Sequence, residues 1–126
     1  MPIKDYQKEV DGWVSQFEPK YWKPHEILAR LSEEVGELAR EVNHLYGPKK
    51  KKATEETREL GDEMGDIIFT LICLANSHNI DLDEVMNNVL EKSRIRDKDR
   101  YDKSESGIGR VLSNFPSRKS LCWHLS

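Results

Sequence analysis

The chain has 126 residues, which suits one domain, because two domains of half this length would each bury too small a core. Hydrophobic residues make up 37% of the sequence and charged residues 34%, a composition typical of soluble proteins with a small core. The net charge of −3 gives no general attraction to nucleic acid or to acidic membranes, so neither is an expected partner.

The sequence contains no segment that predicts membrane insertion or export. The longest apolar run, residues 67–75, is about half as long as a membrane span must be. The first ten residues lack the apolar region of a signal peptide. Cys73 and Cys122 are too few for a disulfide framework, so a reducing compartment, the cytoplasm, is the predicted location.

Apolar residues at helical spacing predict two helices in the first part of the chain. The first is expected over residues 3–17 and ends before Pro19, because a residue that precedes proline disfavours helical backbone angles. The second is expected to start at about Pro24, a residue suited to the first helical position, and to end before Gly47.

Two more helices are predicted in the second part of the chain. One starts at about Thr54, a plausible cap with two glutamates in the first turn. From Ile67 onward apolar residues surround most of this helix, so its second half is expected to be buried on more than one side. The other begins with a capping box over residues 81–84 and runs into a charged segment that ends near Tyr101.

These segments predict an all-α protein with a four-helix bundle-like protomer and antiparallel central helices. Because the hydrophobic content is low for a helical chain, we expect a second copy to cover some apolar surface, as a homo-dimer or homo-tetramer. Residues 1–103 are expected to form the helical domain. Residues 104–126 contain glycine, serine and proline without a sustained period and are expected to form an irregular tail.

Four acidic residues form two pairs on the two central helices. Glu34 and Glu37 are three residues apart, as are Glu63 and Asp66, and residues at this spacing share one face of a helix. If the two apolar stripes pack together, both pairs can lie along the same edge of the interface. Magnesium prefers such oxygen ligands, and its charge would offset the repulsion between carboxylates.

A solvated acidic surface is the alternative explanation, because the chain has 23 acidic residues and such pairs are common. Three glycines count in favour of the metal site, and both explanations stay open at this point. The glycines lie inside the predicted helices beside the acids, and each costs roughly 1 kcal/mol relative to alanine. Glycine at these positions would let helices or a ligand approach closely; the three are Gly36, Gly61 and Gly65.

Residues 20–101 resemble the MazG-like nucleotide pyrophosphohydrolases, an all-helical superfamily. The family signature is two glutamates, two spacers and a third glutamate, followed after a gap by Glu-x-x-Asp. The corresponding sequences here are EEVGE at residues 33–37 and EMGD at residues 63–66. The resemblance implies hydrolysis of a nucleoside triphosphate between its α and β phosphates, which gives the monophosphate and pyrophosphate, as in bacterial housecleaning enzymes.

The resemblance also implies roles for individual residues. Glu34, Glu37, Glu63 and Asp66 would bind Mg²⁺, with Mn²⁺ as a substitute. Glu33 would complete the catalytic group, either by supporting a metal ligand or by orienting water as a base.

Substrate contacts are predicted from the fourth helix and from one aromatic residue. Asn88 and Lys92 are expected to hold phosphates by the same resemblance, and Arg96 lies in the same basic segment. Ordinary surface ion pairs are the alternative for Arg94, Arg100 and Lys92. Trp22 is the better candidate for stacking on a base, whereas Trp13 and Phe17 are expected to pack in the core.

Two other functions stay open on the sequence. One uses the same chemistry on phosphoribosyl-ATP, in histidine synthesis. The other is a non-catalytic helical protein whose acids form a solvated or calcium-binding face. The sequence does not define the preferred base or sugar, because these depend on the shape of the pocket.

Overall fold

The computed structural model describes residues 1–55 and 58–104, and these contain four α-helices and no strand. This confirms the predicted all-α class. The predicted tail lies almost entirely outside the described residues. The chain divides into two compact units, residues 1–88 and the residues from Val89 onward, which are described separately. The helices are α1 (Ile3–Val14), α2 (Pro24–Tyr46), α3 (Leu60–Ser77) and α4 (Leu82–Arg96).

Helix α1 is shorter than predicted and ends at Val14 instead of Phe17. The Ser15 hydroxyl and its backbone N–H both donate to the carbonyl of Asp11, at 2.6 and 3.2 Å. The N–H of Phe17 donates to the carbonyl of Val14 at 3.0 Å. These bonds close the helix with a tight turn, so the aromatic ring of Phe17 follows the helix and is not part of it.

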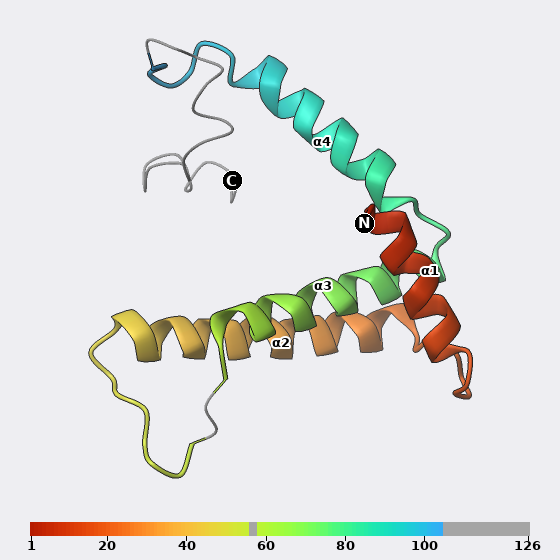
Figure 1. Cartoon of the computed structure of the whole chain (residues 1–126), viewed down its shortest axis with the longest axis horizontal. Coiled ribbons are helices and arrows are strands. Elements are labelled where there is room, and N and C mark those ends of the chain that lie inside the picture. Colours follow the sequence, from red (N-terminus) through yellow and green to blue (C-terminus); the bar gives the residue numbers. More distant parts are fainter. Residues whose placement is uncertain (56–57, 105–126) are drawn as a thin grey trace. The chain divides into compact units, whose positions relative to one another are not determined.

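Helices α2 and α3 lie side by side and form the centre of the first unit (Figure 1). Helix α2 has the extent expected from its flanking Pro24 and Gly47. At its start, the backbone N–H of Lys23 donates to the carboxylate of Glu26 at 3.0 Å and so satisfies one of the free donors of a helix end.

The prediction that the third helix starts at Thr54 is wrong, because α3 starts at Leu60. Glu55, in the loop between α2 and α3, instead contacts α2. The Glu55 carboxylate pairs with Arg40 and His44 of α2, each at 3.2 Å, and its backbone N–H bonds to the carbonyl of Lys52. A residue expected in a first helical turn is therefore used to fasten the loop.

Helix α4 begins as predicted but ends earlier. At its start, the Asp81 carboxylate accepts hydrogen bonds from the backbone N–H groups of Asp83 and Glu84, at 3.0 and 3.4 Å. The helix ends at Arg96 and does not reach Tyr101. The chain turns over the next residues, where the backbone N–H of Arg100 bonds to the carbonyl of Asp97 at 3.3 Å.

A polar network attaches α1 to the end of α3. The side chain of Gln7, which is buried, donates to Asn76 at 3.0 Å and to the carbonyl of Ile80 at 2.7 Å, and it accepts from the N–H of Leu82. Asn76 returns a bond to the Gln7 carbonyl and gives another to the hydroxyl of Tyr21. These bonds fix the position of the aromatic residues that α1 carries.

The apolar core of the described chain is small, and its buried members are Val14, Ile27, Ile72 and Ala75. The second half of α3 was expected to be buried on more than one side, but Ile68 is 55% exposed and Leu71 is 41% exposed. The described residues of one chain therefore leave much of the apolar surface of α3 uncovered. No helix among the described residues is both long and apolar enough to cross a membrane.

Candidate metal and active site

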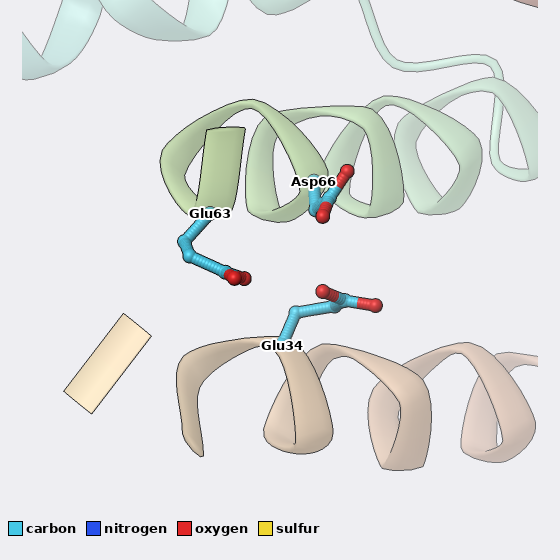
Figure 2. A group of neighbouring side chains, drawn as sticks. All are labelled: Glu34, Glu63 and Asp66. Carbon is cyan, nitrogen blue, oxygen red and sulfur yellow. The ribbon is translucent and has the colours of Figure 1, made fainter. Parts of the chain in front are cut away.

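Three of the four predicted metal ligands face one another between α2 and α3. Glu34 extends from α2, and Glu63 and Asp66 extend from α3 toward it (Figure 2). One carboxylate oxygen from each residue lies within 4.8 Å of the others. Glu34 and Glu63 are buried, at 5% and 1% exposure, and Asp66 is partly buried. Such a group of hard oxygen donors can hold a divalent cation.

Glu63 is the residue whose surroundings favour a cation most strongly. Burial raises its pKa above the usual range, and the charges of Glu37, Asp66 and Glu34 raise it further, while Arg58 opposes the shift. Its Oε2 atom is buried and has no hydrogen-bond partner among the described residues. A buried carboxylate oxygen without a partner is costly, and a bound cation would satisfy it. The residues present therefore fit a divalent metal.

Glu37 and Glu33 lie at the rim of this group. Both are exposed, and both line a polar hollow of about 260 Å³ that also contains Glu34 and Glu63 and that we call the acidic hollow. The charge of Glu37 affects the pKa of Glu63, so Glu37 is close to the three carboxylates without belonging to their cluster. Glu33 points into solvent and pairs with Arg30 at 3.0 Å. Its role in orienting water stays a prediction.

Two arginines occupy the site and were not predicted. The guanidinium of Arg58 donates from Nη2 to Asp66 Oδ2 at 2.8 Å, and its Nε lies 3.2 Å from Glu63 Oε1. Arg30 Nη2 lies 2.8 Å from Glu34 Oε1. The i,i+4 spacing of Arg30 and Glu34 could have revealed the second pair. No spacing could have revealed Arg58, because it lies in the loop before α3.

A second hollow of about 620 Å³ adjoins the carboxylates and is partly aromatic. Trp13 lies against Phe17 and Phe69, with ring centroids 5.1 and 6.2 Å away. Trp22 is 54% exposed and lines the same hollow. Cys73 also lines it, and burial raises the pKa of its thiol. We call this hollow the aromatic pocket.

The core prediction for Trp13 and Phe17 is wrong, because these side chains are 56% and 49% exposed. Their rings form the wall of the aromatic pocket and do not lie inside the helix packing. Charged residues at or beside the carboxylate cluster also line this pocket, namely Arg30, Glu34, Arg58 and Asp66. The pocket thus shares residues with the acidic hollow, and one elongated ligand could occupy both.

The glycines do not bring the helices of this chain closer together. Among the described residues, a Cβ atom added at Gly36, Gly61 or Gly65 would have no heavy atom within 4 Å outside its own helix backbone and chain neighbours. The expectation that they permit close helix packing is therefore wrong within one chain. Room for a ligand remains the other explanation that the sequence offered.

Of the residues predicted on α4, Asn88 belongs to the first unit, and the roles of all of them stay predictions. Asn88 is exposed and lines neither hollow. Lys92 and Arg96 belong to the second unit and are also exposed. Arg96 donates to Asp97 at 3.0 Å, and the hydrogen bond and charge of Asp97 raise the pKa of Arg96. Arg94 and Arg100 form the surface ion pairs that the sequence left as an alternative.

Known proteins resemble this chain in sequence and in fold. Residues 23–101 match the model of the MazG nucleotide pyrophosphohydrolase domain. YpjD of Bacillus subtilis (strain 168) is 51% identical over 105 residues, which cover 83% of this chain and 95% of YpjD. The crystal structure of YPJD from Bacillus subtilis has a TM-score of 0.66 at 51% identity and covers 73% of this chain and 94% of that chain.

A further crystal structure is described as the Bacillus-conserved MazG protein, a nucleotide pyrophosphohydrolase. It is 50% identical to this chain with a TM-score of 0.66, and the likeness covers 79% of this chain and 97% of that one. The similarity therefore extends over nearly the whole of these relatives.

Proposed function

The chain belongs to the MazG nucleotide pyrophosphohydrolase family, and on this premise we propose that it hydrolyses nucleoside triphosphates to the monophosphate and pyrophosphate with magnesium. Family membership makes it a hydrolase that acts on nucleotides. The observation that carries the finer proposal is the carboxylate cluster of Glu34, Glu63 and Asp66, with its buried and unpartnered Glu63 oxygen. Removal of unwanted nucleotides from the cellular pool is the proposed role.

The proposed metal ligands are the three clustered carboxylates together with Glu37 at the rim of the hollow. Magnesium suits them because all are hard oxygen donors, and Mn²⁺ would be accepted by the same set. When bound, a divalent ion neutralises charge on phosphate oxygens and activates water. A bound cation would also offset the repulsion between the clustered carboxylates and the phosphates.

The chain's own groups are proposed to bind and orient the nucleotide. The aromatic pocket would hold the base, with Trp22 stacked on it, because flat aromatic side chains suit a nucleobase. The phosphates would then extend toward the acidic hollow, which shares Arg30, Glu34 and Arg58 with the pocket. Glu33 would accept a proton from the attacking water or orient it.

The polar and basic residues of α4 are proposed to bind phosphate as well. These are Asn88, Lys92 and Arg96, whose exposed side chains are accessible to a ligand.

We propose that the central helices form an antiparallel pair that a second copy completes. The chain direction supports the antiparallel pair, because the colours that follow the sequence run in opposite directions along α2 and α3 in Figure 1. Exposed apolar residues support the presence of a second copy, because apolar surface that faces water is costly. The exposed residues include Val35, Val42 and Leu45 of α2 and Met64, Ile68 and Leu71 of α3.

Pyrophosphate release from a panel of ribo-, deoxyribo- and modified triphosphates tests the proposed reaction. We expect release with magnesium, an equal amount of the monophosphate, and none with a chelator. The ranking of substrates would identify the preferred base and sugar. A folded protein that releases no pyrophosphate from any of them would refute the proposal.

A further inference from the structure

We propose that Arg58 changes partners when the ligands bind. In the metal-free protein its guanidinium neutralises Glu63 and Asp66, the divalent ion displaces it, and the released side chain then binds the phosphates of the nucleotide. This inference rests on the proposed function, because it takes the carboxylate cluster as the metal site.

The contacts of Arg58 are incompatible with a metal at the same oxygens. Its Nη2 lies 2.8 Å from Asp66 Oδ2 and its Nε lies 3.2 Å from Glu63 Oε1, so it bridges two carboxylates of the cluster. Magnesium binds oxygen ligands at about 2.0–2.1 Å. Two cations held by the same pair of carboxylates would repel at such short range. We therefore expect a metal that enters at Glu63 Oε2, which has no partner among the described residues, to displace the guanidinium from these carboxylates.

The position of Arg58 in the chain allows this movement. It lies before α3 begins, in the segment that joins α2 to α3, so a new side-chain rotamer leaves the helix intact. The side chain is 38% exposed, and the backbone of the next residue, Glu59, is extended. Arg30, in contrast, binds Glu34 from the same helix, at the i,i+4 spacing.

The released guanidinium would lie beside the phosphates. Arg58 lines both the acidic hollow and the aromatic pocket. A nucleotide with its base in the pocket and its phosphates in the hollow must therefore pass this residue. Guanidinium groups bind phosphate with two parallel hydrogen bonds, a geometry that lysine does not reproduce.

The first test measures Mn²⁺ binding without nucleotide, from the electron paramagnetic resonance signal of the free hydrated ion. For Arg58→Gln we expect the Kd for Mn²⁺ to fall at least about fivefold, because the competing cation is gone. Arg58→Lys should also bind more tightly than the parent, since an ammonium group cannot bridge the two carboxylates as a guanidinium does. Circular dichroism verifies the fold of each protein.

Arg40→Gln is the matched control. Arg40 lines the same acidic hollow but pairs with Glu55, so its replacement removes the same charge without freeing a ligand of the cluster. Its Kd for Mn²⁺ should stay near that of the parent. An unchanged or weaker affinity in Arg58→Gln, or an equal gain in Arg40→Gln, would overturn the inference. A parent that binds no Mn²⁺ would instead refute the proposed function.

The second test measures nucleotide binding at saturating metal. We expect Arg58→Gln to raise the KM for the preferred triphosphate by about tenfold with a much smaller change in kcat, because a charged hydrogen bond to phosphate is lost. Lys8→Gln, which removes an exposed charge outside both hollows, should keep the parental KM. A parental KM in Arg58→Gln would overturn the proposed change of partner.

Discussion

Gln7 and Asn76 exchange hydrogen bonds between α1 and α3: the Gln7 amide donates to Asn76 Oδ1 at 3.0 Å, and Asn76 Nδ2 donates to the Gln7 carbonyl at 2.9 Å. Asn76 also reaches the hydroxyl of Tyr21, in the segment that leads to α2. Three parts of the first unit therefore meet at one amide. Because α1 carries Trp13, this junction sets the position of the aromatic pocket.

We expect Asn76→Ala to lower the free energy of unfolding by about 2 kcal/mol, because it leaves the buried Gln7 amide without one of its partners. Urea unfolding followed by circular dichroism measures the change. Asn87→Ala is the control, since Asn87 is exposed on α4, and its effect should be within about 0.5 kcal/mol. Equal effects of the two substitutions would contradict the structural role of the junction.

Alkaline pH should reveal the partly buried hydroxyl of Tyr21. Burial and the hydrogen bond to Asp11 raise the pKa of Tyr21 to about 12. The neutral form is favoured in the fold, so its contribution to stability is complete below the ordinary tyrosine pKa and is lost as the pH rises through about 12. An ultraviolet absorbance titration should show a late component that Tyr21→Phe lacks. Its persistence in the variant would be inconsistent with this assignment.

Glu63→Gln should stabilise the metal-free protein at neutral pH. Burial and neighbouring carboxylates raise the pKa of Glu63, so its charged form opposes folding above that pKa and the opposition is relieved as the pH falls through it. In the presence of a chelator we expect a higher Tm than that of the parent at pH 7, and a smaller gain at acidic pH. A lower Tm would mean that the ion pair with Arg58 outweighs the burial of the charge.

With magnesium, the parent should become more stable than Glu63→Gln. A cation that binds only the folded parent raises its Tm, whereas Glu63→Gln lacks one proposed ligand and should gain less. Thermal melts with and without the metal make this comparison in the same samples.

Trp22→Ala should weaken nucleotide binding without affecting the metal. Loss of one stacking surface should raise the KM for the nucleotide roughly tenfold at saturating magnesium. The midpoint for magnesium in a thermal-shift titration should not change. Tyr46→Ala removes an exposed aromatic residue outside the aromatic pocket and should keep the parental KM. A parental KM in Trp22→Ala would place the base elsewhere.

Local signals in the sequence predict the helices well where no distant contact competes. Pro24 and Gly47 define α2 because proline and glycine restrict or release the backbone at their own positions. The start of α3 was predicted too early because Glu55 is held by Arg40 and His44 across the loop. Helical spacing contains no information about such a contact.

The sequence likewise predicts some features of the candidate site and not others. The spacing of the acidic residues predicts that Glu63 and Asp66 share a face of α3, and both do point toward Glu34 (Figure 2). Spacing does not predict that Glu34 is buried while Glu37 is exposed, because this depends on how α2 is rotated against α3.

The aromatic pocket and Arg58 depend on the paths of the loops. Trp13 was expected in the core because an amphipathic stripe does not reveal whether a neighbour covers it. Arg58 was expected inside a helix, whereas the loop places it on the carboxylates of Glu63 and Asp66.

The central claim is that the carboxylate cluster holds the metal that permits hydrolysis of nucleoside triphosphates. The most direct test is magnesium-dependent pyrophosphate release by Asp66→Asn beside Asp62→Asn, which removes an exposed carboxylate one turn earlier on α3. We expect Asp66→Asn to lose at least about a hundredfold in kcat/KM and Asp62→Asn to keep nearly full activity. Full turnover by a folded Asp66→Asn protein would contradict the account.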